Sequence, residues 1–234
     1  MKYRVESEAD LAPYLAPTPI IQADHPAIQA FALDAIAGAT DPVERACRLY
    51  YAVRDGIRYD PYSIVLSVEG LSATRCLAER VGFCVTKAAL LAAAARAVGI
   101  PTKVGYADVR NHLVTGRLKV LMDTDVFVFH GYNELYLAGR WVQATPIFNI
   151  ELCRKFRVKP LEFDGRTDSM LHPFDEDARQ HMEYVRHHGT FADVPHAIIL
   201  PAFARAYGKM FKDGRVVKLG DFGAEAEAER ARPA

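Results

Sequence analysis

The chain has 234 residues, of which half are hydrophobic, and its 29 Lys and Arg residues balance its 29 Asp and Glu residues. This length and composition are typical of a globular protein with a sizeable core. A chain without net charge has no long-range field that attracts nucleic acid or an anionic membrane surface. We therefore expect neither as a partner.

The sequence also predicts the compartment. The first ten residues are charged and lack the apolar segment of a secretory signal. The most apolar stretch, 88–100, is interrupted by Arg96 and is shorter than the ~20 residues of a membrane span. No two of the four cysteines form a C-x-x-C pair, so free thiols are expected. The prediction is a cytoplasmic protein, with no membrane partner and no cofactor.

Two helices are predicted in the first quarter of the chain. One spans 26–37, with Pro26 at its first position and Gly38 beyond its end. The other follows Asp41, which with Pro42 and Glu44 forms a typical helix start, and it closes at Gly56. A short helix is expected over 73–80.

The helix predicted over 84–98 is unusual because alanine dominates it, and Gly99 and Pro101 end it. Cys84, Ala88, Leu91, Ala95 and Val98 fall on one stripe at helical spacing. Small side chains let other elements approach the backbone closely, which predicts a central, buried helix.

Strands are predicted next, over 102–109, 125–137 and 140–145, with Ala138 and Gly139 as a tight hairpin turn. An antiparallel sheet behind a buried helix indicates an α+β fold. Residues 1–150 are expected to form the N-terminal helices and the core, and 151–234 an extension packed on it. Within this extension we predict a helix over 175–188 that ends at Gly189, and a tail, 224–234, that is either a frayed helix or disordered.

Cys84 is the first candidate for chemistry because it follows Gly82-Phe83 at the start of the buried helix. Unpaired backbone N–H groups and the positive end of the helix dipole converge there. Such a site favours a thiolate, lowers the pKa of a cysteine and holds an oxyanion. By itself this cysteine also fits the role of a small buried hydrophobe.

His130 is the candidate base. It lies within a strand rich in β-branched and aromatic residues, so its imidazole would be held rigidly near a sulfur on the neighbouring helix. By itself it also fits a buried core histidine.

Three linked segments resemble the transglutaminase-like superfamily. Gly82-Phe83-Cys84 opens the alanine-rich helix, and Arg96-Ala97-Val98-Gly99-Ile100-Pro101 ends it. His130, Glu134 and Tyr136 then precede Gly139 and Trp141 in the spacing of that family, so that about 40–150 is covered. The resemblance implies a papain-like fold with Cys84 as nucleophile and His130 as base.

The third catalytic position departs from the family, which usually has Asp where this chain has Thr145. If Ala138 and Gly139 form a two-residue turn, Leu137 pairs with Arg140 and His130 falls opposite Ile147. Thr145 and Asn149 are then both diagonal neighbours of His130. Either one is a candidate to orient the imidazole, and a neutral residue can serve because papain-like enzymes use Cys-His-Asn.

The function predicted from these residues is acyl transfer or amide hydrolysis through a thioester, with a peptide or carboxamide substrate. The alternative is a weak or inactive transglutaminase-like module that binds peptides. A third interpretation is a metal-dependent hydrolase built on His181, His187 and His188, with Cys153 as a further ligand. Basic side chains at the C-terminal end of a helix also interact favourably with the helix dipole, which explains these histidines without a metal.

Overall fold

The computed structural model describes residues 6–112, 114–171, 176, 181–217 and 220–230. Its α-helices are α1 Glu8–Leu11, α2 Pro26–Ala35, α3 Pro42–Gly56, α4 Ala73–Glu79, α5 Cys84–Ala97, α6 Gly116–Met122, α7 Ile150–Phe156, α8 His196–Ala206 and α9 Phe222–Arg230. Its strands are β1 Arg58–Tyr59, β2 Val81–Gly82, β3 Thr102–Asn111, β4 Val126–Leu137, β5 Arg140–Ala144, β6 Met182–Phe191, β7 Phe211–Lys212 and β8 Arg215–Val216. The 3-10 turns are η1 Ala12–Tyr14, η2 Pro61–Ser63, η3 Glu69–Leu71 and η4 Gly208–Met210.

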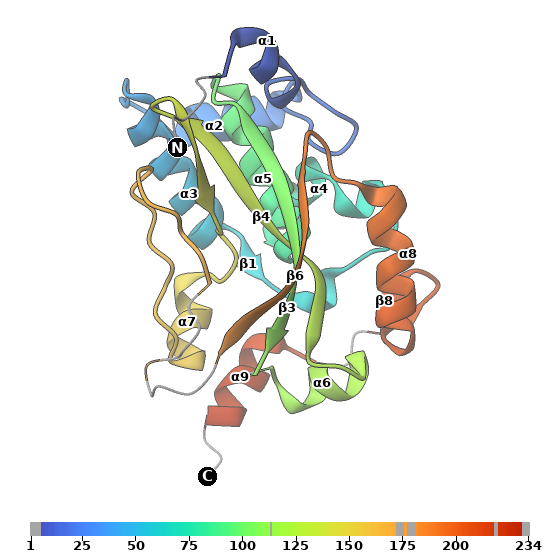
Figure 1. Ribbon diagram of the computed structural model, residues 1–234. Coiled ribbons are helices and arrows are strands. Elements are labelled where there is room, and N and C mark those ends of the chain that lie inside the picture. The colour runs from blue at the N-terminus through green and yellow to red at the C-terminus, as the bar shows by residue number, and fades with distance from the viewer. Residues whose placement is uncertain (1–5, 113, 172–175, 177–180, 218–219, 231–234) are drawn as a thin grey trace.

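A four-stranded sheet with the order β5-β4-β3-β6 forms one layer of the fold, and its neighbouring strands are all antiparallel. Helix α5 packs on β4 and β3, with α2, α3 and α4 around it (Figure 1). The expected α+β architecture, with the cysteine-bearing helix buried against an antiparallel sheet, is therefore confirmed. No helix in the described part of the chain is both long and apolar enough to cross a membrane.

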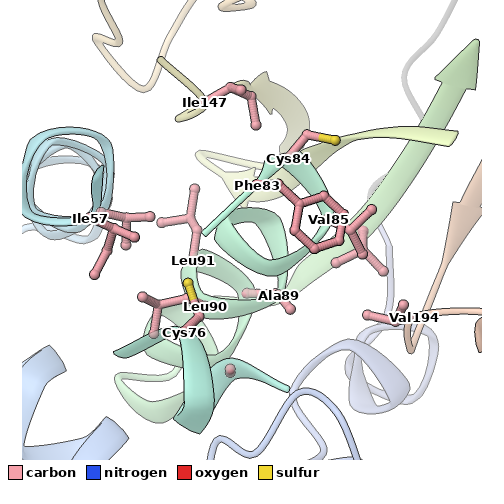
Figure 2. Close-up of a cluster of buried hydrophobic side chains, with 14 of the residues drawn as sticks. Ile57, Cys76, Phe83, Cys84, Val85, Ala89, Leu90, Leu91, Ile147 and Val194 are labelled. Carbon is pink, nitrogen blue, oxygen red and sulfur yellow. The ribbon is translucent and has the colours of Figure 1, made fainter. Parts of the chain in front are cut away.

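Helix α5 is buried from Cys84 to Arg96 because its alanines leave almost no side chain to separate it from its neighbours. The Asn133 side chain on β4 donates from Nδ2 to the Ala88 carbonyl oxygen at 2.9 Å, which fixes the strand against the helix. Figure 2 shows Cys84 at one end of the surrounding apolar cluster, with Phe83, Val85 and Leu91 nearby. The start of α5 is thus a rigid part of the core.

The local signals of the first half are confirmed. The Asp41 carboxylate accepts the Glu44 N–H at 3.0 Å and caps α3 as expected. Helix α2 starts at Pro26, although it ends two residues earlier than predicted. The hairpin pairs Leu137 with Arg140, and both turn residues have positive φ, 48° at Ala138 and 83° at Gly139. This is the conformation that a two-residue hairpin requires.

The helix predicted over 175–188 is wrong. Residues 172–175 and 177–180 lie outside the described residues, and from Met182 onward the chain is strand β6, paired with β3. The acidic start and basic end of this segment suggested a helix. However, Tyr184, Val185 and Thr190 favour a strand, and β3 offers an open edge with which that strand can pair. Gly189, with φ of 89°, lies at a register shift within the strand and does not end a helix.

Two further segments differ in extent from what the sequence predicts. The strand predicted over 102–109 continues as β3 to Asn111, because β4 and β6 pair with it on both sides. The tail, 224–234, expected to be a frayed helix or disordered, is helical as far as Arg230 in α9, whose Phe222 and Ala226 are buried. The Tyr62 hydroxyl anchors this helix by donating to Glu225 at 2.7 Å. Residues 231–234 lie outside the described part of the chain.

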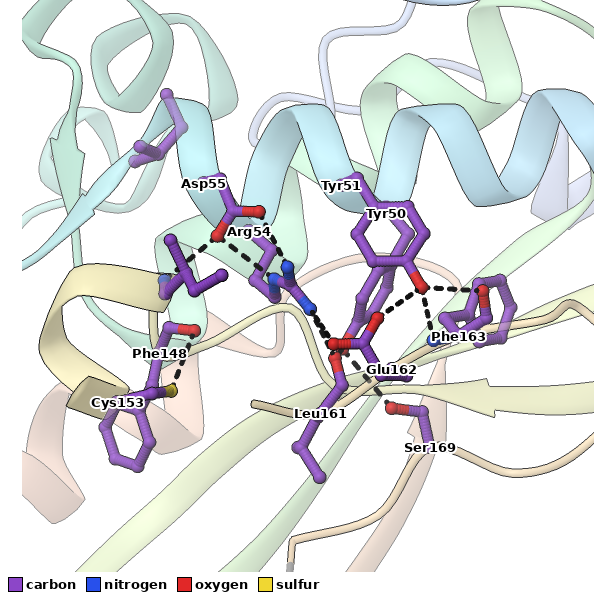
Figure 3. Close-up of polar contacts among 12 residues, drawn as sticks. Tyr50, Tyr51, Arg54, Asp55, Phe148, Cys153, Leu161, Glu162, Phe163 and Ser169 are labelled. Atoms are coloured by element: carbon purple, nitrogen blue, oxygen red, sulfur yellow. Dashed lines mark hydrogen bonds and ion pairs between the residues drawn. The ribbon is translucent and has the colours of Figure 1, made fainter. Parts of the chain in front are cut away.

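Polar contacts from α3 hold the chain that follows β5 (Figure 3). The Tyr50 hydroxyl lies 2.8 Å from the Leu161 carbonyl oxygen and 3.2 Å from that of Thr145. Arg54 donates to the same Leu161 oxygen at 2.8 Å and pairs with Asp55 at 2.7 Å. These contacts fix the segment that carries the third candidate position.

Candidate active site

Cys84 is the first residue of α5, and its side chain is buried. The preceding Phe83 is extended, and its N–H is bonded to the Thr86 hydroxyl at 3.0 Å. One of the unpaired donors at the helix start is thereby satisfied, and the others remain free for the sulfur. The sequence alone placed this cysteine correctly.

The backbone N–H groups of Gly131, Val85 and Cys84 itself act on the sulfur of Cys84 and lower its pKa. Burial acts in the opposite direction and is the larger effect, so that the pKa of Cys84 is raised to about 11. The depressed pKa that the helix position suggested is therefore wrong for this resting site. The thiol is neutral at pH 7, and the N–H groups are arranged for a negative charge that has yet to form.

Gly131 brings β4 against the start of α5. A Cβ atom at this position would lie 2.9 Å from the Cys84 carbonyl oxygen and 3.2 Å from the Val85 Cα. Only glycine allows this approach, which puts the N–H of the residue after His130 beside the sulfur of Cys84. The tertiary structure thus brings Cys84 and the His130 segment together.

His130 itself lies on the other side of the strand. Successive residues of a strand point to opposite faces, and Gly131 faces α5. His130 pairs with Ala107, which belongs to a separate apolar cluster with Val109, Leu171 and Met182. Among the described residues the structure forms no hydrogen bond between the imidazole and Cys84, and the buried Nε2 atom has no partner.

Burial also sets the charge of His130. The side chain is 3% exposed, and desolvation lowers its pKa to about 4. At neutral pH the imidazole is therefore uncharged and Nε2, if unprotonated, can accept a proton. The resting pair is a neutral thiol and a neutral imidazole.

Thr145 and Asn149 follow the end of β5. The β4–β5 ladder stops at the pair of Asn133 with Ala144, so the expected pairing of His130 with Ile147 does not form. Pro146 lacks an N–H, and Ile147 turns back to donate to the Thr145 carbonyl oxygen at 2.9 Å. As a result, the edge of β4 beside His130 is not covered by β5.

Asn149 is committed elsewhere through its side-chain oxygen, which accepts the N–H of Tyr59 at 3.1 Å. Thr145 is buried, and its carbonyl oxygen accepts from the Tyr50 hydroxyl at 3.2 Å. Neither residue is hydrogen-bonded to His130. Which of the two orients the imidazole stays a prediction.

Cys84 lies on the wall of a narrow pocket whose free space is about 20 Å³, room for about one water molecule. The other ten lining residues are apolar or aromatic, and no charged side chain of the described chain lines it. Phe127 and Val128 of β4 form one wall, while Phe203 of α8 and Tyr207 form another. The sulfur therefore lies beside a small apolar pocket, and the fold builds part of that pocket from the C-terminal segment.

Sequence reasoning missed two residues near Cys84. Tyr59 lines the pocket, and burial, together with the neighbouring Cys84, raises the pKa of its hydroxyl well above its usual value. Lys87 is fully buried one turn after Cys84, and its Nζ donates to the carbonyl oxygens of Arg54 at 2.9 Å and Ile57 at 2.7 Å. A lysine within an otherwise apolar helix was the signal that could have found the second.

The C-terminal histidines are not arranged as a helical metal site. His187 and His188 lie on β6, and His188 is bonded through Nε2 to Asp108 at 2.7 Å and stacks on Phe129. No cluster of three or more metal-ligating side chains occurs in the described residues. These observations leave the metal-dependent interpretation without support from geometry.

Comparison with known proteins identifies a family and a similar fold. The model of the transglutaminase-like superfamily matches residues 29–146. A crystal structure of a candidate cysteine protease from Cytophaga hutchinsonii is similar, with a TM-score of 0.52 and 19% identity. The similarity covers 83% of this chain but only 51% of that protein, so the chain spans about half of its length. No curated protein matches the sequence.

Proposed function

Because this chain belongs to the transglutaminase-like superfamily, we propose that it is a cysteine enzyme that transfers or hydrolyses acyl groups through a thioester on Cys84. The observation that carries the proposal is the position of the Cys84 sulfur. It lies beside three backbone N–H groups, one of them from the residue after His130, and it faces a pocket. A purely structural cysteine requires neither the donors nor the space.

The neutral state of both groups suggests how the reaction starts. The imidazole of His130 accepts the thiol proton as the sulfur attacks the carbonyl carbon, so no ion pair has to exist beforehand. The negative charge that develops on the carbonyl oxygen is stabilised by N–H groups at the start of α5. His130 then gives the proton to the leaving amine, and water or a second amine releases the acyl group.

In this structure His130 faces away from α5, so the mechanism requires its imidazole to move to the sulfur past the edge of β4 that β5 leaves uncovered beyond Ala144. Thr145 and Asn149 both follow that edge, and either one is proposed to orient the imidazole. Hydrolysis and transamidation differ only in the second nucleophile. The substrate is proposed to be a peptide or another carboxamide, and the cytoplasm the place of action.

The test uses two cysteine variants. Amide hydrolysis and amine incorporation are measured on a library of carboxamide peptides, with intact-mass detection of the acyl-enzyme. We expect Cys84→Ala to abolish both activities and the mass adduct. The matched control is Cys153→Ala, which removes another buried free thiol outside the pocket and should retain activity. Activity that survives in Cys84→Ala would refute the proposal.

The alternative is a peptide-binding module without catalysis. It is favoured by the absence of a hydrogen bond between Cys84 and His130 in the described structure, and by Thr145 where the family usually has Asp. It predicts that peptides bind wild type and Cys84→Ala equally well and are never turned over. Acyl-enzyme formation on Cys84 excludes it.

A further inference from the structure

A second cleft of the fold has far more free space than the pocket at Cys84. Its free space is about 440 Å³, against about 20 Å³ beside the sulfur, and this is within the size range of small-molecule sites. Its walls come from β1, the segment 60–65, helix α4, β2 and β8. Ile64 forms part of the wall of both spaces, so the cleft adjoins the candidate active site.

Positive charge is in excess in this cleft. Its described lining contains three guanidinium groups and two carboxylates, those of Arg58, Arg75 and Arg215 and those of Asp60 and Glu79. Arg58 pairs with Asp60 at 3.2 Å, and Arg75 pairs with Glu79 at 2.9 Å. Both carboxylates therefore already have a cationic partner, and one positive charge is left for a ligand.

The arginines are positioned by contacts of their own. Arg75 donates from Nη1 to the Gly70 carbonyl oxygen at 3.1 Å, which holds its guanidinium in one place. The backbone of Arg215 is fixed by a bridge to Val65, on the segment that lines the same cleft. A guanidinium has five N–H donors, more than these contacts use, so donors remain for the oxygens of a ligand.

We propose that this cleft binds a small organic anion through a carboxylate or a phosphate group. The planar fork of a guanidinium matches the oxygens of both groups and forms short, charge-assisted hydrogen bonds with them. A cation would meet the excess positive charge, and a purely apolar ligand would remove water from the guanidinium groups without replacing its hydrogen bonds. The proposal concerns binding and does not require that Cys84 acts on the ligand.

The experiment measures binding to the whole chain by calorimetric titration at low ionic strength. The probes share one phenyl ring and differ in the attached group: benzoate, phenyl phosphate, neutral benzamide and cationic benzylamine. We expect at least one of the two anions to bind about tenfold or more tightly than benzamide and benzylamine, and added salt should weaken its binding. The anion with the higher affinity tells whether the ligand carries a carboxylate or a phosphate.

Two arginine variants assign the binding to this cleft. Arg215 is exposed, so a neutral side chain is tolerated there, and Arg215→Gln should weaken binding of the anion at least about fivefold. The matched control is Arg205→Gln, which removes the same charge from the exposed last turn of α8, outside the cleft, and should bind like wild type. Circular dichroism checks that both variants are folded.

Four outcomes would overturn the proposal. They are no binding of either anion, an affinity for benzamide or benzylamine equal to that for the anions, an unchanged affinity in Arg215→Gln, and an equal loss in Arg215→Gln and Arg205→Gln. If Arg215→Gln does not fold, the four probes on wild type decide. None of these measurements involves turnover, so this proposal and that of a cysteine enzyme fail separately.

Discussion

Replacing Gly131 by alanine tests the contact on which the site depends. The added Cβ would lie 2.9 Å from the Cys84 carbonyl oxygen, and ordinary contact begins near 3.4 Å. The atoms it meets are backbone atoms, which cannot rotate away, so β4 and the start of α5 must separate by about 0.5 Å. Overpacking of this kind lowers the free energy of unfolding by about 1–3 kcal/mol.

For a chain of this size that loss corresponds to a decrease in Tm of roughly 2–4 °C per kcal/mol. The separation also moves the Gly131 N–H away from the sulfur, which removes one group that lowers the pKa of Cys84. We therefore expect Gly131→Ala to be alkylated by iodoacetamide at Cys84 more slowly than wild type at pH 8. Urea unfolding followed by circular dichroism gives the stability, and peptide mapping gives the alkylation rate at Cys84.

Gly56→Ala is the matched control. A Cβ atom there meets only the flexible Arg80 guanidinium at 3.8 Å, and the position is helical, so stability should be unchanged or slightly increased. If Gly131→Ala proved as stable as Gly56→Ala and reacted at the wild-type rate, the close contact between β4 and α5 would not position the sulfur.

Three further predictions follow from buried polar groups. Because His130 must be neutral to accept a proton and its pKa is about 4, kcat/KM should decrease only when the pH is lowered to about 4. A decrease centred near pH 6.5 would contradict the neutral-base mechanism. Burial lowers the pKa of Lys87 to about 7, so between pH 7 and 9.5 only the unfolded chain holds that proton. The difference in free energy of unfolding between wild type and Lys87→Met, measured in urea, should then increase with pH by up to about 1.4 kcal/mol per pH unit. A difference that does not change with pH would refute a neutral buried lysine. Asn133→Ala removes the second hydrogen bond of the Ala88 carbonyl oxygen, which keeps its helical donor, and should lower the free energy of unfolding by about 0.5–1.5 kcal/mol. An unchanged urea midpoint would show that this bond does not stabilise the fold.

The residues that the sequence located well are those with strong local signals. Asp41, Pro42 and Glu44 define the start of α3 through bonds within four residues, and Ala138-Gly139 defines its hairpin in the same way. The run from Cys84 to Ala97 specifies a helix, and its small side chains let other elements pack close to the helix backbone. Cys84 could be singled out because its position at a helix start is a local property.

The rest depended on contacts between distant segments. Residues 182–191 carry charges in a helical pattern, yet they form β6 because the open edge of β3 supplies a partner that no local pattern reveals. The protonation states of Cys84 and His130 likewise depend on burial by the whole fold, which raises one pKa and lowers the other.

The sequence by itself determined the helices of the first hundred residues, the hairpin, the α+β class and the two residues proposed for catalysis, because capping, turn geometry and motif spacing are local. Only the tertiary structure decided that His130 and Gly131 point to opposite faces of β4, that β5 stops at Ala144, and that the C-terminal segment completes an apolar pocket at Cys84. The physical reason is that strand edges, desolvation and cavity walls arise from pairing and packing between segments far apart in the chain.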